Sequence, residues 1–189
     1  RSVNIELRER ELRAGGNGPL LASALCAQGA SVTLIGALGE SEAEPVHPAY
    51  RPLVGRCTEA ISITPSARTD ALEFDDGKVM FNWSANLDSI DWTFLVERVG
   101  LDRLRSLCAR VETLATINWT NLGGLPSIWR GLRDEVFPTL DRPPGVFVDL
   151  SDPAKRSDAD VRTIFEDLGS LNTAAPVTLG LNVSEANRL

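Results

Sequence analysis

The sequence contains 189 residues, of which 43% are hydrophobic and 24% charged, and its formal net charge is -7. This length and composition are ordinary for one globular domain and argue against a disordered or fibrous chain. The acidic balance argues against a nucleic-acid-binding surface, which needs clustered Lys and Arg. The longest apolar runs are far shorter than the roughly 20 residues that span a bilayer. We therefore expect a protein that handles small molecules, with neither nucleic acid nor a membrane as partner.

Three cysteines, Cys26, Cys57 and Cys108, are widely spaced and odd in number. This pattern favours free thiols over a disulfide framework, as in the cytoplasm. The first fifteen residues are charged and lack the apolar core of a signal peptide. Residue 1 is Arg rather than Met, so we expect the start to be processed or missing.

The first predicted elements are a helix and a strand. Residues 17–30 have apolar side chains at helical spacing, with Pro19 suited to the first turn and Gly29 to the position after the end. Residues 31–39, SVTLIGALG, form a short apolar run typical of a strand buried on both faces. This order indicates an α/β layer with a parallel sheet.

The middle of the chain alternates between apolar and polar residues. The pair Asp76-Gly77 predicts a hairpin, because both central positions of a type I′ turn need positive φ. Together with a segment near the start, this stretch predicts an antiparallel excursion from the main sheet, formed by residues of approximately 2–13 and 58–86.

The α/β rhythm returns from about residue 89. We predict helices at residues 101–111, 125–140 and 158–171, and strands at 114–118, 145–150 and 177–182. Consecutive β-α units bring the carboxyl ends of their strands to one edge of a sheet, where ligands bind. That edge collects Asn118, Asp149 and Asn182. The chain, residues 1–189, is predicted as a single domain.

The segment AGGNGP, residues 14–19, places glycines and an amide before the first helix. It would let backbone approach a ligand and present free N–H groups, although a tight turn explains it equally well. A dinucleotide-binding fingerprint matches poorly. Leu21 stands where its third glycine belongs, and the preceding segment is too charged for a buried strand.

Asn182 and Glu185 follow the last predicted strand. An amide offers both donor and acceptor, and a carboxylate can hold Mg²⁺ directly or through water, which suits phosphate chemistry. The alternative is an ordinary helix cap with a Glu in the first turn. Their position at the ligand edge favours the phosphate role.

Four segments in order resemble motifs of the ribokinase-like (PfkB-type) carbohydrate kinases, from about residue 12 to the last residue. They are GGNGPLLASALCAQGASVTLIGALGE, ARTDALEFDDGKVMFN, VFVDLSDPAKR and LGLNVSEANRL. The resemblance implies a Rossmann-type three-layer α/β sandwich, with a mainly parallel sheet between helices and a small antiparallel β lid. It also implies ATP-dependent phosphoryl transfer to a sugar hydroxyl, with Mg²⁺.

The resemblance also assigns residues. Gly15, Gly16 and Asn17 would lie against the sugar, and Asn118 would be a further substrate ligand. The family often has an asparagine at the position of Leu20, and a lysine or other polar residue at that of Asn17, so the identity of the sugar is open.

On the nucleotide side, the resemblance implies that Asn182 and Glu185 organise Mg²⁺ and the phosphates of ATP, with Glu185 reaching the metal through water. Asp149 is a weaker ligand candidate, since capping of the following loop explains it equally well.

The family's catalytic aspartate lies in a Gly-Ala-Gly-Asp motif that does not occur here, and we expect it beyond Leu189. The family's opening strand is also absent. We therefore expect a partial chain without a catalytic residue, inactive alone. In this family the lid often pairs between subunits, which suggests a homodimer. Two alternatives are a non-catalytic sugar- or effector-binding member and a dinucleotide-binding domain of an oxidoreductase.

Overall fold

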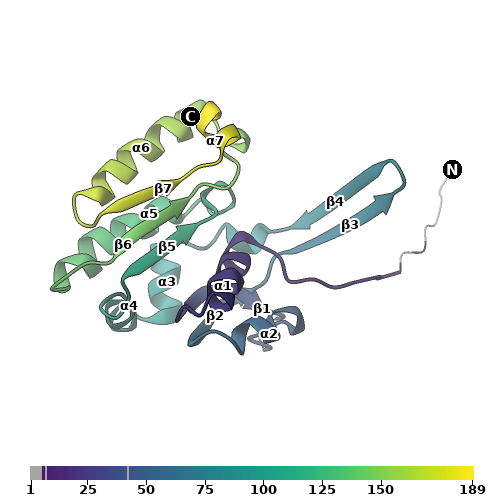
Figure 1. Ribbon diagram of the computed structural model, residues 1–189, viewed down its shortest axis with the longest axis horizontal. Helices are drawn as coiled ribbons and strands as arrows, with labels where there is room; N and C mark the ends of the chain where they lie inside the picture. The colour runs from purple at the N-terminus through teal and green to yellow at the C-terminus, as the bar shows by residue number, and fades with distance from the viewer. Residues whose placement is uncertain (1–5, 7, 42) are drawn as a thin grey trace.

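The computed structural model describes residues 6, 8–41 and 43–189. It has an α/β body, with parallel strands flanked by helices, and a two-stranded antiparallel hairpin that projects from the body (Figure 1). The predicted α/β class with a small antiparallel appendage is confirmed.

The first part of the body contains one helix packed beside two parallel strands. Helix α1 (Asn17–Ala27) leads into β1 (Thr33–Gly39), which pairs in parallel with β2 (Glu59–Pro65). Gly29, with φ 83°, ends the helical segment as predicted. A short helix, α2 (Arg51–Val54), lies between the two strands in the chain. A small core holds this part together and consists of Ala22, Leu34, Leu38, Tyr50 and Leu53.

The second part of the body is built on three parallel strands in sequential order. They are β5 (Thr113–Ile117), β6 (Gly145–Asp149) and β7 (Val177–Gly180). The sequence pattern predicted all three. Because they run in parallel, their carboxyl ends lie at one edge of the sheet.

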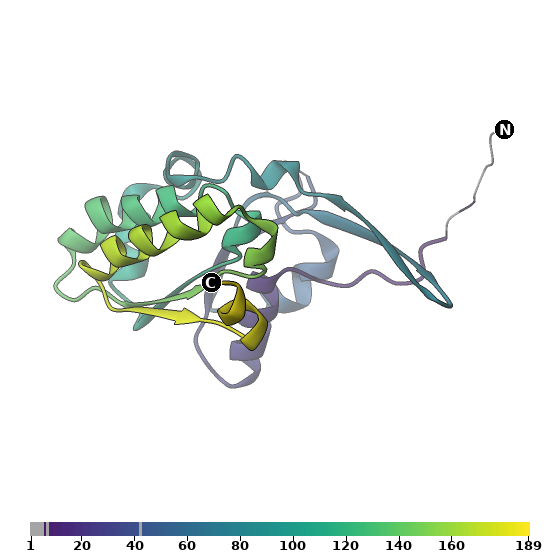
Figure 2. The same ribbon diagram turned by 90° about the horizontal axis from the view of Figure 1, so that it is seen from above.

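Helices cover one face of this three-stranded sheet, as Figure 2 shows for α5 (Leu125–Gly131) and α6 (Asp158–Asn172). The helical segment after α5 continues through a π-helical stretch and a 3-10 turn to residue 139, as predicted for residues 125–140. Helices α3 (Trp92–Val99) and α4 (Leu101–Cys108) precede β5. The pattern predicted α4 but not α3.

Burial alternates along β6. Val146 and Val148 are fully buried in the main core, whereas Phe147 and Asp149 are only half-buried. The prediction of a buried strand at residues 145–150 is therefore correct for one face only. Side chains alternate between the two faces of a strand. The face with Phe147 and Asp149 is free to line a site.

The hairpin consists of β3 (Arg68–Phe74) and β4 (Gly77–Trp83). Its two-residue turn is Asp75-Asp76, one residue earlier than predicted, and no residue from 75 to 77 has positive φ, so the type I′ assignment was wrong. We keep the name β lid for this hairpin.

The predicted lid range, 58–86, was too long. Residues 59–65 form β2, which pairs in parallel with β1 rather than antiparallel in the lid. Residues 61–64 alternate between apolar and polar side chains although β2 pairs in parallel, so alternation did not distinguish the two kinds of sheet. Of the other predicted lid segment, 2–13, residues 1–5 and 7 lie outside the described residues, and residues 6 and 8–13 are in no strand.

The parallel strands do not form one main sheet. Within the described residues, β1 and β2 form one sheet and β5, β6 and β7 another, with no ladder between β1 and β5. The predicted mainly parallel α/β architecture holds, with the parallel strands of this part of the chain divided between two ladders. No helix in the described ranges has the length and apolar character needed to cross a bilayer.

We predict that Gly131→Ala destabilises the full-length protein. A Cβ at Gly131 would overlap the indole of Trp92, whose Nε1 donates to Glu135 (2.6 Å). Overpacking of this kind costs about 1–3 kcal/mol of unfolding free energy, measurable by urea denaturation. The matched control is Gly169→Ala in α6, where nothing lies within 4 Å of the new Cβ. This control should be neutral or stabilising by up to about 1 kcal/mol. Equal effects in the two variants would contradict the packing argument.

Candidate functional site

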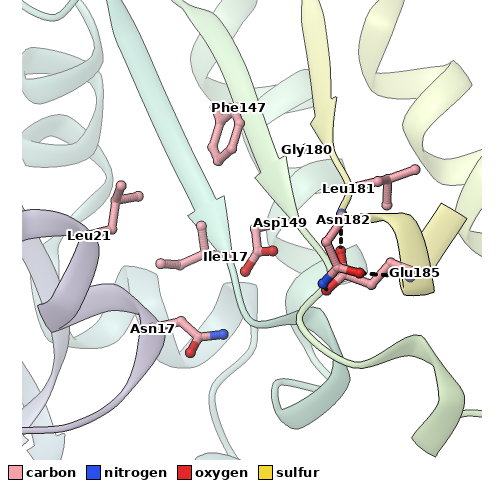
Figure 3. Close-up of a pocket in the computed structure, with 9 residues that line it drawn as sticks. All are labelled: Asn17, Leu21, Ile117, Phe147, Asp149, Gly180, Leu181, Asn182 and Glu185. Atoms are coloured by element: carbon pink, nitrogen blue, oxygen red, sulfur yellow. Dashed lines mark hydrogen bonds between the residues drawn. The ribbon is translucent and has the colours of Figure 1, made fainter.

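A cavity of about 290 Å³ lies at the carboxyl edge of β5, β6 and β7 (Figure 3). Side chains from α1, from the three strands and from the start of α7 (Val183–Arg188) surround it. Its lining residues are Asn17, Leu21, Ile117, Phe147, Asp149, Gly180, Leu181, Asn182 and Glu185. Four of the residues singled out from the sequence therefore meet in one place.

The wall from α1 carries Asn17 and Leu21, four residues apart and hence on one face of the helix. The Asn17 side chain donates from Nδ2 to Oγ of Ser151 at 3.1 Å. A Cβ added at Gly18 would lie 3.7 Å from Cδ1 of Ile117. The first turn of α1 is thus tied to the loop after β6 and packs close to the end of β5.

Asn182 and Glu185 form a reciprocal capping box at the start of α7. Oδ1 of Asn182 accepts from the Glu185 N–H, and Oε2 of Glu185 accepts from the Asn182 N–H, both at 2.9 Å. Nδ2 of Asn182 also donates to Oε1 of Glu185 at 2.7 Å. The cap predicted as the alternative is therefore present. It holds the Glu185 carboxylate in a fixed orientation at the cavity (Figure 3).

Asp149 ends β6 and lines the cavity between Asn17 and Asn182 (Figure 3). Its carbonyl oxygen accepts from the Asn118 N–H at 2.9 Å. Among the described residues, no group of three His, Cys, Asp or Glu side chains gathers as a metal cluster. Any metal here would rely on Asp149, Glu185 and non-acidic oxygens.

The apolar part of the cavity was not predicted. Phe147 precedes Asp149 by two positions and so lies on the same strand face, a signal that could have identified it. Gly180 lies beside it, because a Cβ there would come 2.7 Å from Cζ of Phe147. The absence of a side chain at Gly180 therefore leaves room for the Phe147 ring at the cavity.

Three predicted substrate residues do not line this cavity. Gly15 and Gly16 directly precede α1, and Gly16 has φ 86°, a conformation that favours glycine. The Gly15 carbonyl accepts from the Tyr50 hydroxyl at 3.3 Å. Burial raises the pKa of Tyr50, which keeps this hydroxyl a donor.

Asn118 is the third predicted substrate residue that does not line the cavity. It follows β5 in the left-handed conformation, with φ 72°, and its Oδ1 accepts from Nδ2 of Asn121 at 2.7 Å. The left-handed backbone turns the chain into the next loop, and Asn118 is absent from the cavity lining. Its predicted role as a substrate ligand remains a prediction.

The comparison with known proteins identifies the family. The model of the prokaryotic ketohexokinases, Khk, matches residues 1–189, the whole chain. The chain belongs to the prokaryotic ketohexokinase family. A ketohexokinase of Haloferax volcanii is 32% identical over 189 residues, which cover 100% of this chain and 49% of the relative. The chain thus spans about half the length of that curated relative. No solved structure matches.

Ketohexokinases are ribokinase-like (PfkB-type) carbohydrate kinases, so the family resemblance is confirmed. The dinucleotide-binding alternative required a buried strand directly before Gly15. Residues 8–13 are instead exposed and in no strand. Both findings count against an oxidoreductase domain.

Proposed function

We propose that the full-length protein is an ATP-dependent ketohexokinase that transfers a phosphoryl group to a hydroxyl of a ketohexose. The supporting observation is the cavity itself. It brings Asn17, from the first family motif, together with Asn182 and Glu185, from the last, and with Asp149 between them. The family match and the name of the Haloferax volcanii relative support the sugar class.

The sugar side of the site is assigned to the start of α1. Asn17 can hydrogen-bond hydroxyls through its amide oxygen, while its Nδ2 is held by Ser151. The backbone of Gly15 and Gly16 allows close approach, and Asn118 is the further substrate contact that we propose.

The phosphate side is assigned to Asp149, Asn182 and Glu185. The side-chain atoms of these residues that could ligate a metal are all oxygens, and two of the three residues are carboxylates. This set is suited to Mg²⁺ held partly through water. When bound with ATP, Mg²⁺ neutralises charge on the phosphate oxygens. Asn182 orients Glu185, and Glu185 would act through a water molecule.

We assign no residue of this chain as the acceptor of the proton from the attacking hydroxyl. The family's Gly-Ala-Gly-Asp motif does not occur among the 189 residues, so we assign no catalytic residue within them. Leu189 packs against the main core, and its N–H donates to the Glu185 carbonyl at 3.1 Å. The expected position of the catalytic aspartate beyond Leu189 stays a prediction, as does the inactivity of these residues alone.

We place the protein in the cytoplasm, because ATP is its proposed donor and its cysteines are free thiols.

The first test is activity of the full-length protein. We expect ATP-dependent phosphorylation of ketohexoses, measured as ADP release and as phosphorylated sugar, and loss of turnover when Mg²⁺ is removed by chelation. Saturable sugar binding without phosphorylation would instead indicate the non-catalytic alternative. The absence of both binding and turnover with every ketohexose tested would contradict the proposed substrate class.

A second test distinguishes a capping role of Asn182 from a role in the proposed ATP site. Asn182→Ala and Ser157→Ala remove equivalent capping boxes, at α7 and α6 respectively. Each should cost about 1 kcal/mol of helix stability. Only Asn182→Ala should lower kcat/KM for MgATP, by about tenfold or more, because its amide also orients Glu185. If the two variants retain equal kcat/KM, Asn182 has only a capping role.

We also propose that the protein forms a homodimer through the β lid. Directly paired residues of a hairpin share a face. The pairing therefore places Leu72, Phe74, Val79, Phe81 and Trp83 on one face, which is largely apolar. Its large members are exposed: Phe74 61%, Val79 47%, Phe81 49% and Trp83 56%. Contiguous exposed apolar residues of this kind mark interaction sites. The identical face of a second copy would cover them symmetrically.

Phe81→Asp should convert the dimer to a monomer in sedimentation velocity, because it places a charge in the apolar contact. The control is Asn82→Asp on the opposite face of β4, where an acceptor for the Thr69 hydroxyl (2.7 Å) is retained. A wild-type protein that is monomeric at high concentration would overturn the dimer proposal. A Phe81→Asp protein that remains dimeric would move the contact away from the lid.

A further inference from the structure

A second cavity, of about 310 Å³, lies where the β lid joins the body. We call it the lid-root cavity. Ser84 and Asp88 come from the segment after β4, Thr120 and Asn121 from the loop after β5, and Lys155 and Arg156 from the loop after β6. It has no lining residue in common with the cavity assigned to sugar and ATP.

The lid-root cavity is positive within an acidic protein. Lys155 and Arg156 contribute two positive charges against one carboxylate, Asp88, although the whole chain has a net charge of -7. Lys155 Nζ lies 3.5 Å from Asp152, but both side chains are exposed, so this pair contributes little. In the described part of the chain, Arg156 forms no ion pair. An anion is the ligand that this charge balance favours.

The Arg156 guanidinium is held in place by Trp119. It stacks over the Trp119 ring, 5.2 Å from the centroid, and one terminal nitrogen donates to the Trp119 carbonyl at 3.2 Å. Its Nε is buried and has no hydrogen-bond partner among the described residues. A buried donor without a partner is costly, so this guanidinium is both positioned and under-satisfied.

The neighbouring groups suit an oxyanion. Within the described residues the Ser84 hydroxyl makes no hydrogen bond and is available as a donor. Gly123 also lines the cavity, and a Cβ there would meet a terminal nitrogen of Arg156 at 3.7 Å. Because Gly123 has no side chain, a ligand in the cavity can approach the Arg156 guanidinium at this point. A planar guanidinium, an ammonium and a hydroxyl together are typical of phosphate recognition.

We propose that the lid-root cavity is a second anion site, which binds a phosphate group through Arg156 and Lys155. The phosphate is either free or carried by a phosphorylated sugar. Because the cavity joins the lid to the loops after β5 and β6, a bound phosphate links these three segments and limits the movement of the lid. The site does not depend on kinase activity.

The test is titration calorimetry of the full-length protein with inorganic phosphate and no nucleotide. Arg156→Gln should weaken phosphate binding by about tenfold or more, because a charged hydrogen-bond donor is lost. Lys155→Gln should weaken it less. The latter variant covers the case in which Arg156→Gln fails to fold, since the Lys155 side chain is exposed and its ion pair with Asp152 is weak. Arg162→Gln, on the exposed side of α6, is the matched control and should bind as wild type.

Asn182→Ala distinguishes this site from the proposed ATP site, because it should leave binding of inorganic phosphate unchanged. In a second arm, a ketohexose phosphate and the unphosphorylated ketohexose compete with phosphate. If the sugar phosphate competes and the unphosphorylated sugar does not, the ligand is a sugar phosphate. If neither compound competes, the ligand is free phosphate. The proposal is overturned if wild type shows no saturable binding below about 10 mM. It is also overturned if the Arg156 and Lys155 variants bind as wild type, or if Asn182→Ala removes binding.

Discussion

Both cavities depend on hydrogen bonds that continue the pairing of β5 and β6 beyond the ends of the strands. The Asn118 N–H donates to the Asp149 carbonyl (2.9 Å), and the Thr120 N–H and hydroxyl donate to the Leu150 carbonyl (3.1 and 2.7 Å). Leu150 is fully buried, so these bonds are shielded from water. They keep the two loops together. Ile117 and Asp149, directly before these loops, line the proposed sugar and ATP cavity, and Thr120 and Arg156, within them, line the lid-root cavity. Asn118 and Ser151, both with positive φ, turn the chain at this junction.

The one-sided cover of the three-stranded sheet determines which residues can bind ligand. Helices α5 and α6 bury Val146 and Val148, which leaves the alternate residues of β6 for the cavity. The opposite wall comes from α1, in the first part of the body, and is joined to the sheet through the Asn17–Ser151 hydrogen bond. Asn17, on the proposed sugar side, and the groups assigned to phosphate thus belong to different parts of the body, and this hydrogen bond helps to fix their relative position.

Sequence reasoning located the features that strand direction determines and failed where contacts between distant segments decide. Parallel strands that end at or just before Asp149 and Asn182 had to bring both to one edge, and they line one cavity. Asn118 has the same strand-end position but does not line the cavity; its backbone is left-handed, and its Oδ1 accepts from Asn121. Sequence reasoning did not single out Arg156, because its stacking on Trp119 joins positions far apart in the chain. The lid boundary failed because alternation does not reveal which strand will pair.

The helix cap and the phosphate site at Asn182 and Glu185 are compatible, although they were alternatives in the sequence. A surface glutamate loses side-chain entropy when it binds a metal or water in one geometry. Here the capping box has already fixed the carboxylate, since both of its oxygens accept from Asn182. Each carboxylate oxygen has a second lone pair, so these bonds leave acceptor capacity on both oxygens. The cap therefore pre-organises the carboxylate, and a ligand bound there would in turn stabilise the first turn of α7.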